Sequence, residues 1–103
     1  MERESEDWRT EETSRLLEAI VRLETVDEAA AFFRDLCTLP ELHDLAQRWA
    51  VVRLLADGLH YAEISQRTGA STATITRIAF WLRHGEGGYR AALEKAGTAV
   101  PRS

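Results

Sequence analysis

Residues 58–85 constrain the fold more than any other part of the chain. Gly69 can take a positive φ angle without a Cβ clash, so a helix that precedes it is expected to end there. The hydroxyl of Ser71 can cap a second helix. Ile75 and Ile78 follow on one face of that helix at helical spacing, so they can pack it onto the first. The segment predicts two short helices joined by a tight turn.

Two small residues favour a helix-turn-helix over a generic αα-corner, which is the alternative for any two helices joined by a glycine turn. Ser65 lies where the second helix must cross the first closely, and Ala70 supplies a small apolar plug in the turn. All of these positions fall in the register of DNA-binding helix-turn-helix segments. We therefore place a helix-turn-helix at residues 59–84.

The outward side of the second helix carries short polar, methyl-bearing or cationic side chains, which suit a helix that enters a major groove. The expected DNA-contacting residues are Arg67, Ser71, Thr72, Ala73, Thr74, Thr76 and Arg77. Thr72 and Ala73 are expected to contact bases. Arg77 lies later in the helix and is expected to reach a phosphate.

The net charge of −4 conceals an uneven distribution. Residues 1–45 carry thirteen acidic side chains and five arginines, whereas residues 46–103 carry four acidic and eight basic ones. The basic excess therefore lies in the half that contains the helix-turn-helix, where phosphate contacts depend on the local face. Because this excess is modest, one subunit alone should bind DNA weakly.

Helical periodicity along the rest of the chain predicts an all-α fold of six helices, without strand-like alternation. We expect a mobile arm at residues 1–9, one helical domain at 10–96 and a disordered tail at 97–103. Thr25 with Glu28, and Thr38 with Glu41, form predicted capping boxes for the second and third helices. Cys37, the single cysteine, is expected to be a buried small hydrophobe on a helical face.

Several classes of function are not expected. The three histidines lack metal-ligand spacing, and no hydroxyl has a general base next to it, so we expect neither a metal site, nor a cofactor, nor an enzyme. The chain has no apolar run long enough to span a membrane and no signal peptide at its start. We therefore expect a cytoplasmic protein.

Residues 41–58 and 69–77 together resemble the Trp repressor superfamily, most sharply in Ala-Thr-Ile-Thr-Arg at 73–77. The chain is more similar still to the YerC/YecD-type branch of Trp-repressor-like proteins. The shared motifs are Phe-Phe-Arg-Asp-Leu-Cys-Thr-Leu at 32–39, Leu-Ala-Gln-Arg at 45–48 and Thr-Gly-Ala-Ser-Thr-Ala-Thr at 68–74.

The resemblance implies an intertwined homodimer that holds two helix-turn-helix units about one DNA turn apart, roughly 34 Å. On the first and third helices, apolar residues cover a wider face than a single neighbouring helix can bury. This independently favours a dimer over a tight monomeric bundle. The expected partners are therefore double-stranded DNA and a second copy of the chain.

The resemblance also raises the question of a corepressor. In the Trp repressor two arginines enclose the tryptophan ring, and their matching positions here are Arg48 and Arg77. A glycine and a serine of that ligand site are replaced by Ile78 and Trp81, so these larger side chains are expected to fill a vestigial pocket. We favour a regulator without a ligand over one gated by tryptophan or by another small molecule.

Two functions from different classes stay open. The first is a dimeric, sequence-specific transcriptional regulator, with bacterial repressors as the nearest type. The second is a helical protein-interaction module that retains the helix-turn-helix as a docking corner. Phe80 and Trp81 would serve the second function if they were exposed, because aromatic pairs can anchor a partner.

Overall fold

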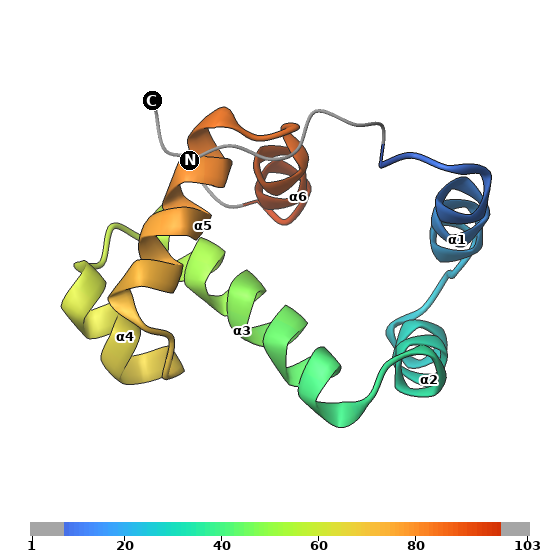
Figure 1. Ribbon diagram of the computed structural model, residues 1–103, viewed down its shortest axis with the longest axis horizontal. Coiled ribbons are helices and arrows are strands. Elements are labelled where there is room, and N and C mark those ends of the chain that lie inside the picture. The colour runs from blue at the N-terminus through green and yellow to red at the C-terminus, as the bar shows by residue number, and fades with distance from the viewer. Residues whose placement is uncertain (1–7, 98–103) are drawn as a thin grey trace. The chain divides into compact units, whose positions relative to one another are not determined.

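Six α-helices form the regular structure of the computed structural model, which describes residues 8–97 (Figure 1). The helices are α1 (Glu11–Val21), α2 (Val26–Leu36), α3 (Leu39–Ala56), α4 (Tyr61–Thr68), α5 (Thr72–His84) and α6 (Gly88–Lys95). Residues 8–97 contain no strand, so the prediction of a six-helix, all-α fold is confirmed. Apart from residues 8, 9 and 97, the predicted arm and tail lie outside the described residues.

The chain divides into two compact units, residues 1–42 and residues 43–103. The first unit contains α1, α2 and the first turn of α3. Each of these helices is preceded by a threonine N-cap. Its hydroxyl oxygen accepts a hydrogen bond from a backbone N–H in the first turn, which has no carbonyl partner within the helix. Thr10 Oγ1 accepts a hydrogen bond from the Thr13 N–H at 3.1 Å, and Thr25 Oγ1 accepts one from the Glu28 N–H at 3.0 Å. The Glu28 carboxylate reaches back to the Glu24 N–H at 3.2 Å, one residue beyond the N-cap.

A complete capping box starts α3. The Thr38 N–H donates to Glu41 Oε1 at 2.8 Å, and the Glu41 N–H donates to Thr38 Oγ1 at 3.3 Å. The backbone hydrogen bond from Thr38, followed by the one from its side chain, lowers the pKa of the Glu41 carboxyl below its ordinary value. This box fixes where α3 begins, as the sequence predicted.

Cys37 differs from the prediction that it is buried on a helical face. Helix α2 ends at Leu36, and Cys37 is its C-cap residue, with extended backbone angles of φ −109° and ψ 149°. Because the capping box of α3 begins at the next residue, the chain leaves the helix before Cys37 can join its apolar side. The cysteine is therefore only half-buried.

Among residues 8–42, the described part of the first unit, α1 and α2 contain no fully buried residue, so these helices do not enclose a core. Large apolar side chains remain exposed on both helices. Their exposed fractions are 36% at Leu16, 79% at Val21, 85% at Val26 and 51% at Leu36. Burying such side chains normally supplies about 1.5–3 kcal/mol each. These helices therefore lack most of the apolar burial that stabilises a small domain.

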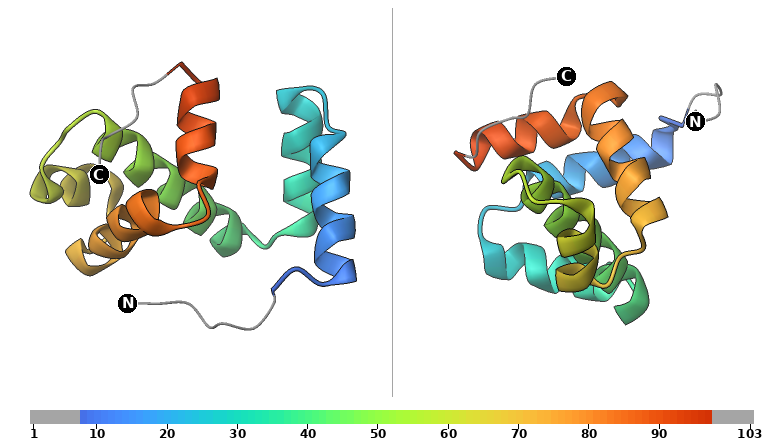
Figure 2. Two further views of the ribbon diagram at one scale, coloured as in Figure 1. Left: turned by 90° about the horizontal axis from the view of Figure 1, so that it is seen from above. Right: turned by 90° about the vertical axis from the view of Figure 1, so that its left-hand side faces the viewer.

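The second unit has a continuous core drawn from α3, α4, α5 and α6. Its buried members are Val51, Val52, Ile64, Ala70, Ile75, Ile78, Leu82 and Leu93. Helices α4 and α5 lie side by side next to the C-terminal end of α3 (Figures 1 and 2). This unit therefore has the rigid support that a recognition surface needs.

Candidate nucleic-acid interface

The turn between α4 and α5 is built from short-range hydrogen bonds around a left-handed glycine. Gly69 ends α4 with φ +80° and ψ −1°, angles that carry little cost only without a Cβ. Ser65 Oγ donates to the Ala70 carbonyl oxygen at 2.6 Å, and Ala70 itself is only 3% exposed. The sequence predicted a small side chain at position 65 because two helices cross closely there. The structure shows that Ser65 also forms a hydrogen bond with the backbone of the turn.

A hydrogen bond from α3 secures the same turn. Gln47 Nε2 donates to the Thr68 carbonyl oxygen at 3.0 Å, at the last residue of α4. The sequence pattern predicts no role for Gln47, although the residue lies within the Leu-Ala-Gln-Arg motif at 45–48. Its half-burial is visible only in the structure, so no signal in the sequence pointed to this hydrogen bond.

The N-terminus of α5 is capped as predicted. Ser71 Oγ accepts from the Thr74 N–H at 3.1 Å, and the hydroxyls of Ser71 and Thr74 are 3.0 Å apart. Ile75 and Ile78 are 0% and 5% exposed and join the core. The predicted contacts Ser71 and Thr74 therefore engage each other in the cap, which limits what their hydroxyls can offer to DNA.

The opposite side of α5 is open to solvent. Thr72, Ala73, Thr76 and Arg77 are all exposed. Thr76 Oγ1 donates to the Thr72 carbonyl oxygen at 2.9 Å, so the Thr76 hydroxyl keeps its lone pairs and its methyl group for an outside partner. The structure thus brings four of the predicted DNA-contacting residues together on one short, solvent-exposed face of α5.

The two cations predicted for this region differ in their surroundings. Arg67 donates through Nη2 to Glu63 Oε2 at 2.8 Å, an exposed pair that offsets part of its charge. Among residues 8–97, Arg77 has no ion-pair partner. Arg77 therefore offers a full positive charge next to the threonine face.

The four residues of the predicted vestigial pocket have different environments. Ile78 is buried in the core, whereas Arg48 and Arg77 are both exposed. Trp81 is half-buried and meets the Phe80 ring edge to face at 4.9 Å. Phe80 in turn lies 4.8 Å from the His84 ring, so neither aromatic side chain projects alone into solvent.

The described residues, 8–97, contain neither a cluster of metal ligands nor a membrane-spanning helix. Within them, no group of three His, Cys, Asp or Glu side chains is arranged to hold a metal ion. None of the six helices has the length and apolar character needed to cross a membrane.

Comparison with known proteins gives one consistent result. The family model for the Trp repressor protein matches residues 11–97. The uncharacterized protein YerC of Bacillus subtilis (strain 168) is 42% identical over 87 residues, which cover 84% of each chain. A crystal structure of a TrpR-like protein from Eubacterium eligens has a TM-score of 0.83 at 39% identity, covering 90% of this chain and 96% of that one.

A candidate Trp repressor from Staphylococcus aureus is equally similar in structure, with a TM-score of 0.83 and 38% identity. That alignment covers 90% of this chain and 93% of the other. These matches confirm the resemblance inferred from the motifs at 32–39, 45–48 and 68–77. The chain belongs to the Trp repressor family.

Proposed function

We propose that the protein is a dimeric, sequence-specific DNA-binding regulator of transcription rather than an enzyme. The observation that carries the proposal is the exposed face of Thr72, Ala73, Thr76 and Arg77 on a capped helix backed by a closed core. Short hydroxyl and methyl groups can meet base edges, and the arginine can meet a phosphate. Membership of the Trp repressor family supports the same function.

The first unit supports the proposal of a homodimer. Helices α1 and α2 contain no fully buried residue, yet they carry exposed leucines and valines in an ordered, capped form. A second copy of the chain can supply the missing apolar contacts symmetrically. Dimerisation would also place two recognition helices about one DNA turn, roughly 34 Å, apart, and so compensate for the modest charge of one unit.

We propose further that tryptophan does not gate DNA binding. Ile78 stands where the Trp repressor has a glycine next to the ligand, and its side chain is buried. Adding L-tryptophan should therefore leave the melting temperature and the DNA affinity unchanged. A ligand at 100 times its Kd would stabilise the protein by about 2.7 kcal/mol, a shift of several degrees, and such a shift would overturn this part of the proposal.

A salt-dependent DNA titration tests the proposed function. A preferred site is first selected from a pool of random duplexes, and its affinity is then measured between 50 and 200 mM salt, as log K against log of salt concentration. Arg77→Ala should weaken all duplexes alike and lower the slope by about one. Arg15→Ala is the matched control, because Arg15 is exposed on α1 and already pairs with Glu11.

Equal slopes for Arg77→Ala and Arg15→Ala would contradict the DNA contact assigned to α5. A failure to enrich any duplex would instead favour the protein-docking alternative. The half-exposed aromatic row of Phe80, Trp81 and His84 is the feature that favours that alternative.

A further inference from the structure

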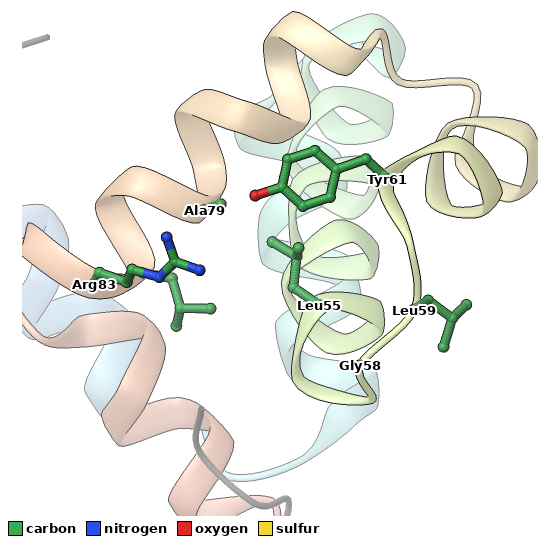
Figure 3. Close-up of a pocket in the computed structure, with 7 residues that line it drawn as sticks. Leu55, Gly58, Leu59, Tyr61, Ala79 and Arg83 are labelled. Atoms are coloured by element: carbon green, nitrogen blue, oxygen red, sulfur yellow. The ribbon is translucent and has the colours of Figure 1, made fainter. Parts of the chain in front are cut away.

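The second unit contains a cavity of about 180 Å³ between α5 and the turn that joins α3 to α4. Leu55 and Leu59 line it from α3 and the turn, and Ala79 lines it from α5 (Figure 3). Leu82 of α5 completes the apolar lining. None of the vestigial-pocket residues Arg48, Arg77, Ile78 and Trp81 lines this cavity. It is therefore a different site from the one at which the Trp repressor binds tryptophan.

Small residues create the space. Ala79 has no side chain beyond Cβ, and Gly58, at φ +83°, has none at all. A Cβ added at Gly58 would have no heavy atom within 4 Å. The space beside Gly58 and Ala79 is therefore open, next to a well-packed core.

Two polar groups face this otherwise apolar space. Figure 3 shows the Tyr61 hydroxyl and the Arg83 guanidinium directed toward the same region, beside Ala79. Among residues 8–97, Arg83 has no ion-pair partner, and neither Arg83 nor Tyr61 forms a side-chain hydrogen bond with another of these residues. The cavity thus combines leucine side chains with a solvent-exposed cation and a solvent-exposed hydroxyl, neither of which has a partner in the described part of the chain.

We propose that this cavity binds a small monocarboxylate with a compact apolar body of about the size of one aromatic ring. Arginine forms two parallel hydrogen bonds with a carboxylate, and the tyrosine hydroxyl can donate a third. An enclosed apolar cavity of about 150 Å³ holds benzene, and this half-open pocket of about 180 Å³ offers comparable room beside Leu55 and Leu82. A hydrated phosphate ion would make no favourable contact with the apolar side chains that line the cavity.

The position of the site suggests what binding would do. Tyr61 is the first residue of α4, and Arg83 lies in the last turn of α5. A carboxylate held by both side chains would link the two helices of the helix-turn-helix at the end away from its turn. This coupling to DNA binding rests on the proposed function, whereas binding itself does not.

Titration of the DNA-free protein with sodium benzoate, followed by amide NMR shifts, tests the site alone. Saturable shifts should appear at residues around the cavity with a Kd of about 1 mM. Benzyl alcohol has the same ring without the charge and should bind about 10-fold more weakly, because hydrogen bonds to charged groups are the stronger ones. Equal affinity for the two compounds, or no saturable shift with benzoate, would overturn the proposal.

Matched variants locate the site. Arg83→Gln should weaken benzoate binding about 10-fold, and Tyr61→Phe should weaken it by a smaller factor, about 3-fold. Both side chains are exposed enough for these substitutions to leave the fold intact. Arg53→Gln removes an exposed arginine that does not line the cavity and should change nothing. Unchanged benzoate binding in Arg83→Gln would place the ligand elsewhere and refute the assignment.

Discussion

The hydroxyl groups at the start of α5 divide into two functional pairs. Ser71 and Thr74 bond each other and the backbone, so they hold the helix start in place. Thr76 bonds the Thr72 carbonyl, which fixes its side chain while leaving its acceptor sites outward. Ser71 and Thr74 therefore have a structural role, whereas the exposed side of Thr72 and Thr76 stays available for recognition.

The variants Ser71→Ala and Thr72→Ala should separate these roles. Loss of the cap in Ser71→Ala should lower the free energy of unfolding by about 1 kcal/mol, measured by urea denaturation. Thr72→Ala removes an exposed side chain outside the cap, so its stability should stay within about 0.5 kcal/mol of the parent. Its sequence preference should instead change by about 1–3 kcal/mol at one base pair. The opposite pattern would show that the roles are reversed.

At the scale of the elements, Gln47 joins α3 to the turn of the helix-turn-helix through the Thr68 carbonyl. Gln47→Met keeps the length and apolar stem of the side chain but removes the donor. It should cost about 0.5–1.5 kcal/mol in unfolding free energy. Gln47→Glu places an acceptor against the carbonyl oxygen and should cost more, so the order of urea midpoints should be Gln, Met, Glu. Equal midpoints for all three would mean that this hydrogen bond has no net effect.

The capping box of α3 should make stability depend on pH. Because the folded pKa of Glu41 lies below its ordinary value, its stabilising contribution is present above the unfolded pKa and is lost as pH falls through the folded pKa. Glu41→Gln can still cap the helix but cannot titrate. The difference in urea midpoint between the parent and Glu41→Gln should therefore shrink from pH 7 toward pH 3. A difference that does not vary with pH would contradict this role of the carboxylate.

Local structure could be predicted where short-range chemistry determines it. The Thr38–Glu41 box, the Ser71 cap and the Gly69 turn depend only on neighbouring residues, so the sequence was sufficient. The Gln47–Thr68 hydrogen bond and the cavity beside Ala79 each depend on residues more than twenty positions apart in the sequence. Hydrophobic periodicity does not predict which distant residues come into contact. Cys37 was misplaced because the helical pattern was extended through it, although the predicted capping box at Thr38 already required α2 to end just before that residue.

At the scale of the whole molecule, the two units differ in how they are stabilised. Helices α3 to α6 enclose a core, whereas α1 and α2 contain no fully buried residue and expose several large apolar side chains. The charge balance changes close to the same boundary, because acidic residues outnumber basic ones up to residue 45 and basic residues outnumber acidic ones after it. The N-terminal unit is therefore suited to assembly and the C-terminal unit to contact with a polyanion.

Leu36→Glu should dissociate the proposed dimer. Leu36 lies on the apolar stripe of α2 and is 51% exposed in the single chain. In a monomer this substitution would cost little, but in a dimer it would bury a charge. Sedimentation at micromolar concentration should give about twice 11.6 kDa for the parent and a shift toward 11.6 kDa for the variant. Ala31→Glu, on the opposite side of α2, is the matched control and should remain dimeric.

The bare apolar sides of α1 and α2 have a consequence for gene dosage. If these helices are completed only by a second copy, the amount of assembled protein rises roughly with the square of chain concentration while chains are scarce. Cells that make few copies would then leave their operators almost empty, and a modest increase in synthesis would fill them abruptly. In the proposed regulator, helices that are completed only by a second copy would thereby make DNA occupancy depend steeply on the amount of protein that the cell makes.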